Sequence, residues 1–266
     1  MSMNFADLIL TSVETISAYD ILTGAHLYTM DELQNASIAQ AQDKTDITGK
    51  MGRKLASLKK NKAITISATN GVISAGLMES QTGCKFENKV TKVRWTDYLK
   101  VTSNAATTTY KAVGTTGNEI EYVDVKNSDG VVVKTLTQDS AASEGKFTYD
   151  PATKALAFKS GDIADNTEIV VHYDRNIQAD VLTNISDCYS KKVTMYIDCF
   201  AEDKCGVVYR VQFYVPKADV SGEFTLEFGD NQAVHAFEAE SLAGACGAGD
   251  ILYTYTVYGA DAEDAA

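Results

Sequence analysis

The residues of this chain best suited to chemistry lie in one basic stretch, where Gly49 and Gly52 stand beside Lys50, Arg53 and Lys54. Glycine-rich turns next to cations can hold phosphate groups through backbone N–H groups and a lysine. Such a cradle requires the spacing G-x-x-x-x-G-K-[ST] directly after a buried strand. Neither condition is met here, so the sequence does not predict a nucleotide site.

The histidines and the clustered carboxylates do not have the spacing of a metal site. Three histidines fall in separate predicted strands or loops, with no cysteine or carboxylate at ligand spacing. Asp198, Glu202 and Asp203 lack the glycine-punctuated pattern of a calcium loop. No G-x-S-x-G motif supports a serine nucleophile. We therefore expect no metal, no cofactor and no enzymatic activity. The histidines are His26, His172 and His235.

The cysteines are odd in number in a chain long enough to fold without cross-links, which favours a reducing compartment. A disulfide between Cys199 and Cys205 across a turn is a less favoured alternative. That pair also lacks the C-x-x-C spacing of a zinc knuckle or redox site. The cysteines are Cys84, Cys188, Cys199, Cys205 and Cys246.

Charge is unevenly distributed along the 266 residues. The net charge of −12 argues against a protein that binds nucleic acid electrostatically. Residues 1–110 contain 12 basic and 10 acidic side chains, and residues 111–266 contain 12 basic and 26 acidic ones, so the balances are +2 and −14. We infer that one part of the chain is suited to dock on the other part of a neighbouring copy.

Most of the early positive charge lies in the segment Asp43–Lys62, for which we predict a long loop. Gly49 and Gly52 would lower the cost of its backbone shape. Binding to DNA phosphates is the alternative, but the acidic remainder of the chain would repel DNA. Docking on an acidic protein surface is therefore favoured. The cations are Lys44, Lys50, Arg53, Lys54, Lys59, Lys60 and Lys62.

The elements on either side of this segment would position it. Residues 37–42 and 64–69 alternate in polarity and are predicted strands. A short helix capped by Asn70 is predicted next, with a hairpin at Asn70-Gly71 as the alternative. One face of that helix would carry Val72, Ile73, Gly76, Leu77 and Ser80.

The middle of the chain indicates an inserted domain. Residues 103–118 are rich in Thr, Ala and Gly, and short predicted strands then follow at intervals of about ten residues. A turn at Asn127–Gly130 joins the first two of these strands. We predict a main domain formed by residues 1–117 and 176–266, and a small immunoglobulin-like β-domain at 118–175. The insert's strands are 120–126, 131–137, 146–149, 155–158 and 169–173.

The remaining segments also predict a mainly β fold. Residues 13–30 indicate a hairpin that turns at Thr23-Gly24, and residues 229–249 indicate a short helix or an apolar loop. The acidic tail 260–266 has a composition typical of disorder. Further strands are predicted at 86–101, 193–200, 207–215, 224–228 and 251–258.

One stretch of the sequence resembles a known family. The run TGKMGRKLASLKKNKAITISATNGVISAGLMESQTG is similar to the corresponding part of the major tail tube proteins of long-tailed bacteriophages. The resemblance extends more loosely over residues 15–99 and 187–258. It implies a tail-tube-type β-sandwich or half-barrel that stacks in hexameric rings and forms the conduit for DNA ejection. A long loop, here Asp43–Lys62, would bridge successive rings.

The resemblance also implies partners and a place of action. The partners would be further copies of the chain and other tail proteins, namely the tape measure, terminator and baseplate. DNA would pass without specific binding, because an acidic wall leaves it free to slide. Which acids face the lumen depends on strand register. Candidate lumen acids are Glu87, Asp97, Asp198, Glu223 and Glu227.

The alternative interpretation is another virion structural part, a capsid-decorating or head–tail connector protein. It shares the β-rich composition and the lack of catalytic motifs. We expect no signal peptide, because no basic segment precedes the apolar run Leu8–Leu10, and no run approaches the ~20 apolar residues of a membrane helix. The protein would be made and assembled in the cytoplasm of a host bacterium and would act in the virion tail.

Overall fold

The computed structural model describes residues 8–227, 234–244 and 249–259. The chain forms two compact units, one of Met1–Phe86 with Leu182–Ala266 (unit 1) and one of Glu87–Val181 (unit 2). Both consist mainly of β-strands, and α1 (Ala75–Thr82) is the one α-helix among the described residues. The prediction of a mainly β fold with one short helix is confirmed.

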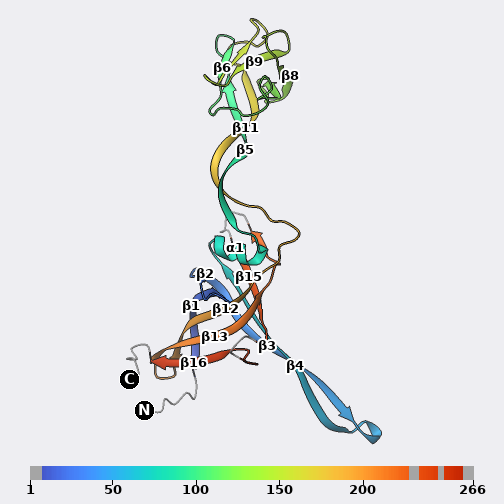
Figure 1. Cartoon of the computed structure of the whole chain (residues 1–266), viewed down its shortest axis with the longest axis vertical. Coiled ribbons are helices and arrows are strands. Elements are labelled where there is room, and N and C mark those ends of the chain that lie inside the picture. Colours follow the sequence, from blue (N-terminus) through green and yellow to red (C-terminus); the bar gives the residue numbers. More distant parts are fainter. Residues whose placement is uncertain (1–7, 228–233, 245–248, 260–266) are drawn as a thin grey trace. The chain divides into compact units, whose positions relative to one another are not determined.

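Unit 1 contains a curled nine-stranded sheet (Figure 1). Its strands are β1 (Leu8–Asp20), β2 (His26–Met30), β3 (Leu33–Thr48), β4 (Lys54–Asn70), β12 (Lys192–Asp203), β13 (Val208–Val220), β14 (Leu226–Glu227), β15 (Val234–Ser241) and β16 (Thr254–Gly259). The order is β2-β1-β12-β13-β15-β4-β3, with β14 paired to β15 and β16 paired to β13. The first part of β13, Tyr209–Tyr214, pairs with β16, and its last part, Ala218–Val220, pairs with β15. The sheet therefore branches at β13.

The sheet of unit 1 has a buried face and an accessible face because its strands alternate. In β12, Met195, Ile197 and Cys199 are buried, whereas Tyr196 and Asp198 between them are only partly buried. Strand β13 shows the same alternation, and its buried side chains pack against those of β12. The predicted strands 193–200 and 207–215 are therefore confirmed, and the hairpin over 13–30 is confirmed as β1 and β2.

The predicted loop Asp43–Lys62 is wrong, because most of these residues continue β3 and β4. The two strands pair from Leu33 with Asn70 to Thr48 with Lys54. The loop is reduced to a tight turn, in which the Gly49 N–H donates to the Arg53 carbonyl at 2.7 Å. At this turn Gly52 has a φ of +73°, whereas Gly49 is extended and lies against the Leu55 side chain.

Helix α1 begins later than predicted. Ser74 is its N-cap, and the Ser74 hydroxyl accepts a hydrogen bond from the Leu77 N–H. Val72 and Ile73 precede the helix and are exposed, so they do not form part of a buried helical face. Gly76 allows α1 to approach β2, since a Cβ at this position would lie 2.6 Å from the carbonyl oxygen of Leu27.

Strand β15 occupies part of the segment for which a helix or an apolar loop was predicted. It pairs with β4 from His235 with Asn70 to Ser241 with Ile64, and it continues the core through Phe237 and Ala239. Both predicted alternatives are therefore wrong for residues 234–241. Residues 228–233, 245–248 and 260–266, which include the predicted acidic tail, lie outside the described part of the chain.

Unit 2 is built around a second sheet, of seven strands in the order β5-β11-β7-β8-β9-β10-β6. The pairing of β8 with β9 is parallel. The predicted turn is confirmed, because the Asn127 side chain accepts hydrogen bonds from the Asp129 and Val131 N–H groups. The strands are β5 (Phe86–Lys100), β6 (Ala105–Thr107), β7 (Tyr122–Lys126), β8 (Val132–Gln138), β9 (Lys146–Asp150), β10 (Ala155–Phe158) and β11 (Glu168–Leu182).

The limits of unit 2 differ from those of the predicted insert. Unit 2 includes β5, β6 and the full length of the described β11 up to Val181, and so extends beyond residues 118–175 on both sides. Its core is separate, with Phe147, Leu136 and Ile169 fully buried in one cluster. The immunoglobulin-like description of residues 118–175 stays a prediction.

The position of β15 predicts a contrast between two neighbouring substitutions. Phe237→Ala removes a buried ring from the core of unit 1 and should lower the free energy of unfolding by about 3–5 kcal/mol. Glu238→Ala, on the exposed face, should change it by less than about 0.5 kcal/mol. Urea unfolding of both variants measures the difference, and equal small effects would contradict the burial of β15.

Candidate assembly surfaces

The outer part of the β3–β4 hairpin is a two-stranded arm, defined here as residues 41–63. Figure 1 shows it projecting beyond the other strands of unit 1. Strand β15 pairs with β4 only from Ile64 to Asn70, so the arm has no third strand among the described residues. A hairpin without a third strand or a packed face is marginally stable in water. The arm is therefore a candidate surface for contact with another molecule.

The arm is amphipathic. Directly opposed residues share a face, and alternate residues lie on opposite faces. Thr45 opposes Leu58 and Ile47 opposes Ala56, which together make one largely apolar face. The Ile47 and Leu58 side chains are 42% and 55% exposed. An apolar strand face left in water is typical of an interaction site.

The arm also concentrates positive charge. Lys44 opposes Lys59 directly, a like-charge pair that destabilises a hairpin unless an external anion compensates. The Asp46 carboxylate forms an ion pair with Lys54 at 2.7 Å and lies 3.9 Å from the Lys44 amine, so two lysines share one counterion. Among the described residues the other five cations of the arm have no ion pair. They are Lys50, Arg53, Lys59, Lys60 and Lys62.

An acidic patch, defined as Asp219, Glu238 and Glu240, lies on unit 1 where β13 meets β15. Asp219 opposes Glu240 directly across the two strands, which is a like-charge pair of the other sign. These side chains line a shallow hollow of about 320 Å³ with Gly222. The nearest cation is Lys192, whose Nζ is 4.0 Å from Asp219. This patch has the charge and exposure that would complement the arm.

The accessible face of β1, β12, β13 and β16 is polar and rich in tyrosine. Tyr196 contacts Tyr19 and Tyr214, with ring centroids 5.5 Å and 5.0 Å away. Burial, followed by the neighbouring Tyr214 and Tyr19, raises the pKa of the Tyr196 phenol above its ordinary value. Arg210 on this face is neutralised by Glu14 at 2.8 Å.

Asp198 is the one predicted lumen acid on this polar face. Its carboxylate accepts from the Gln212 side chain at 2.9 Å and from the Thr15 hydroxyl at 3.4 Å. Glu223 and Glu227 are exposed elsewhere in unit 1, before and within β14. Glu87 is an exposed residue of unit 2 paired with Lys89 at 2.7 Å. Of the five predicted acids, therefore, Asp198, Glu223 and Glu227 belong to unit 1, and Glu87 and Asp97 belong to unit 2.

Asp97 is wrong as a lumen candidate because it is buried in unit 2, with an exposed fraction of 6%. Its carboxylate accepts from Trp95 Nε1, from the Tyr173 hydroxyl, and from both the N–H and the hydroxyl of Thr109, at 2.7–2.9 Å. Burial alone would raise the pKa of Asp97, but these four hydrogen bonds outweigh it and hold the pKa below its ordinary value. Asp97 is a structural carboxylate that joins β5 to β11.

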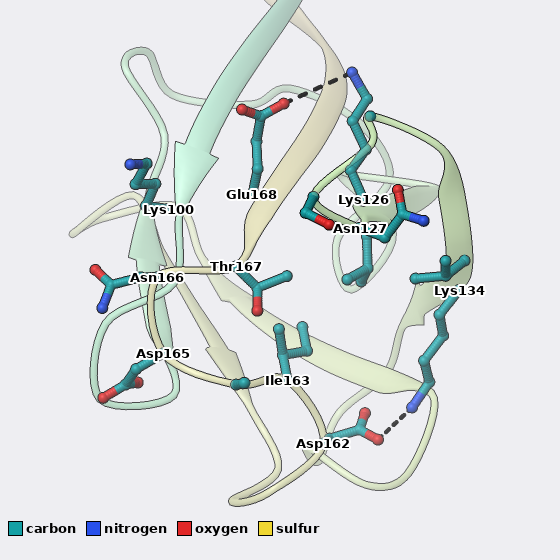
Figure 2. A pocket seen from close by; sticks show the side chains of 15 residues that line it. Lys100, Lys126, Asn127, Lys134, Asp162, Ile163, Asp165, Asn166, Thr167 and Glu168 are labelled. Atoms are coloured by element: carbon teal, nitrogen blue, oxygen red, sulfur yellow. Dashed lines mark hydrogen bonds and ion pairs between the residues drawn. The ribbon is translucent and has the colours of Figure 1, made fainter.

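Unit 2 contains an open cleft of about 660 Å³ (Figure 2). Two of its lysines are already neutralised, Lys134 by Asp162 and Lys126 by Glu168. Lys100 is the third lysine of the lining.

The sequence comparison covers nearly the whole chain. The profile of the YomU/Tube protein family matches residues 8–254. The chain belongs to the YomU/Tube protein family. Membership agrees with the predicted class of phage tube structural protein. A comparison with curated proteins gives no significant match.

Two further properties of this YomU/Tube family member concern metals and membranes. Within the described residues, no group of three or more His, Cys, Asp and Glu side chains is arranged to hold a metal ion. In the same part of the chain, no helix has the length and apolar character needed to span a membrane.

Sequence reasoning missed the apolar face of the arm and the tyrosine row. The signal for the first is present, since Thr45 and Ile47 alternate with charged residues, as do Ala56 and Leu58 with polar ones. The tyrosine row has no local signal, because Tyr19, Tyr196 and Tyr214 are brought together only by strand pairing.

Asp97→Asn should destabilise this YomU/Tube protein, because one amide replaces an acceptor that four donors face. The expected loss is about 1–3 kcal/mol of unfolding free energy, measured for unit 2 by chemical denaturation at pH 7. Since the folded-state pKa is depressed, this stabilisation is present above the ordinary pKa of 3.8 and is lost as the pH falls through the folded-state value. Glu87→Gln, an exposed matched control, should be nearly neutral. A neutral Asp97→Asn would contradict the structural role.

Proposed function

We propose that the chain is a major tail tube protein of a long-tailed bacteriophage. It polymerises into stacked rings, hexameric by resemblance, that form the conduit for DNA ejection. The observation that carries the proposal is the arm, which exposes apolar side chains and, within the described part of the chain, has five cations without ion pairs and no third strand. Its membership in the YomU/Tube family supports the same function.

Rings form through the open edges of the sheet. Strand β2 is paired on one side by β1, and β16 is paired on one side by β13. These edges lie at opposite ends of the strand series β2-β1-β12-β13-β16, so each copy offers two different edges to its neighbours. A heterologous contact of this kind makes a ring when its rotation closes, and closure removes the exposed edges.

Rings stack through the arm. The arm of one copy lies on the acidic patch of a copy in the next ring, which compensates both like-charge pairs, Lys44 with Lys59 and Asp219 with Glu240. The apolar face formed by Ile47 and Leu58 is buried in the same contact. Because the contact removes water from these charges, each ion pair between arm and patch contributes more binding free energy than an exposed ion pair does.

The lumen is lined by the polar face that carries Asp198 and the tyrosine row. On this face the cation beside the tyrosine row, Arg210, is neutralised by Glu14, and Asp198 contributes negative charge. DNA then passes without specific binding, since no phosphate contacts release counterions. A high-resolution map of the assembled tube tests this assignment, and a predominantly basic lumen would refute it.

The tube acts in the virion tail and is assembled in the cytoplasm of the host bacterium. Its partners are further copies of the chain together with the tape measure, terminator and baseplate proteins. In this function the chain is structural and has no enzymatic activity, in keeping with its tube family.

The stacking contact predicts the effect of reversing charge on the arm. The variant with Lys59→Glu, Lys60→Glu and Lys62→Glu should stay folded by circular dichroism but lose tubes in negative-stain micrographs, because the arm would repel the acidic patch. The control makes the same charge change at exposed lysines of unit 2, Lys92, Lys111 and Lys159, and should form tubes normally.

A charge exchange distinguishes this contact from general electrostatic effects. Adding Asp219→Lys, Glu238→Lys and Glu240→Lys to the reversed arm should restore tubes, because the signs are again complementary. The patch variant alone should fail to polymerise. Tubes formed by the reversed arm without compensation would rule out the arm as the bridging element.

A further inference from the structure

The segment before β12 lies against the C-terminal end of α1 in unit 1. The Lys191 N–H donates to the Ser80 carbonyl at 2.8 Å, and the Lys191 carbonyl accepts from the Val220 N–H at 3.1 Å. At the end of α1, Gly83 has a φ of +74°, and a Cβ there would lie 2.0 Å from the carbonyl oxygen of Tyr189. The backbones of residues 83 and 189 are therefore in direct contact.

This contact brings two thiols together, because one cysteine follows Gly83 and another precedes Tyr189. The Cys84 thiol is the first-ranked cause that raises the pKa of Cys188, which agrees with the close approach of the two segments. Both thiols are free, Cys84 buried and Cys188 partly accessible. The other two described cysteines are separated from each other, with Cys199 in the core of the sheet and Cys205 exposed at the β12–β13 turn.

We propose that Cys84 and Cys188 are the site of a reversible oxidation that forms an intramolecular disulfide in unit 1. A disulfide forms only between cysteines whose backbones lie close together, and the backbones of the adjacent residues 83 and 189 are in contact. The backbone hydrogen bonds of Lys191 to Ser80 and Val220 hold the segment that contains Cys188 in place, so we expect disulfide formation to need little rearrangement. The proposal is independent of tube formation.

The chemistry is thiol–disulfide exchange with a small disulfide as the oxidant. The thiolate of Cys188, the accessible member, attacks the small disulfide and releases one small thiol, leaving a mixed disulfide on Cys188. The thiolate of Cys84 then attacks the Cys188 sulfur and releases the second small thiol. The protein loses two electrons and two protons, and both are recovered in the two small thiols.

The cross-link would close a covalent loop around the whole of unit 2, because residues 87–181 lie between the two cysteines. A disulfide that closes a loop of about 100 residues strongly restricts the unfolded chain, and for a protein of this size we expect an increase in Tm of about 5–10 °C. The two thiols remain reduced in a reducing compartment and join in an oxidising one.

The experiment uses the full chain with Cys205→Ser and Cys246→Ser, which leaves three thiols. Reduced protein is incubated with glutathione disulfide at pH 8.5, because the contact with Cys84, burial and Asp187 raise the pKa of Cys188 and slow exchange at neutral pH. Thiol titration in denaturant should fall from three thiols to one. Peptide mapping without reductant should find residues 84 and 188 in one linked peptide, and dithiothreitol should reverse both changes.

Two single variants serve as controls. In the Cys84→Ala variant the reaction should stop after its first step, which leaves Cys188 in a stable mixed disulfide with glutathione. In the Cys188→Ser variant no cross-link should form. The proposal is overturned if the parent protein keeps all three thiols, if Cys188 retains glutathione while Cys84 stays free, or if the linked peptide comes only from disulfide-joined dimers.

Discussion

A two-stranded hairpin satisfies the backbone hydrogen bonds of its inner edges but cannot bury its side chains, and this constraint governs the arm of the protein. Over residues 41–63 every pairing is between β3 and β4 alone. The inner half of the same hairpin is stabilised differently, since Ile64 and Ile66 pack in the core and β4 pairs with β15. The inner half of this pair of strands thus belongs to a folded core, and the outer half is the part that we propose contacts another copy.

The rest of unit 1 is consistent with assembly through surfaces. Alternation along β12, and along β13 on either side of Val215 and Pro216, gives the sheet a buried apolar face and an accessible polar face. Two like-charge pairs of opposite sign remain on its surface, Lys44 with Lys59 and Asp219 with Glu240. Within the chain one member of each pair has a nearby counterion, Asp46 for Lys44 and Lys192 for Asp219, and in the proposed stack each pair would compensate the other between copies. The physical argument for a polymer and the family membership therefore agree.

The sequence predicted those elements whose signals are local. Alternating apolar residues identified β12 and β13, and the sequence Asn127–Gly130 identified a turn. Strand β15 was missed because its buried positions include His235 and Ser241, which weaken the apolar period. The His235 ring is buried, and its Nε2 forms a hydrogen bond with the side chain of Gln81, 154 residues away in the sequence. No local pattern contains that information.

The site was less predictable than the fold for the same reason. The cations of the arm were visible in the sequence, but their strand conformation depends on pairing with a polar partner that carries little apolar signal. Asp97 resembled the other charges of a solvent-facing strand, yet Tyr173, 76 residues later, and Thr109 complete its burial. The number of charged residues could be read from the sequence. Which of them are buried, and which lie opposite each other across two strands, depends on the strand register, which the sequence does not show.

The central claim is that the arm of each copy packs on the acidic patch of another. Electron cryo-microscopy of the wild-type protein at high concentration tests this most directly. The account predicts a tube in which Ile47, Leu58 and the lysines of the arm lie against Asp219, Glu238 and Glu240 of a copy in the adjacent ring. A protein that remains monomeric, or a tube whose arms extend into solvent, would contradict it.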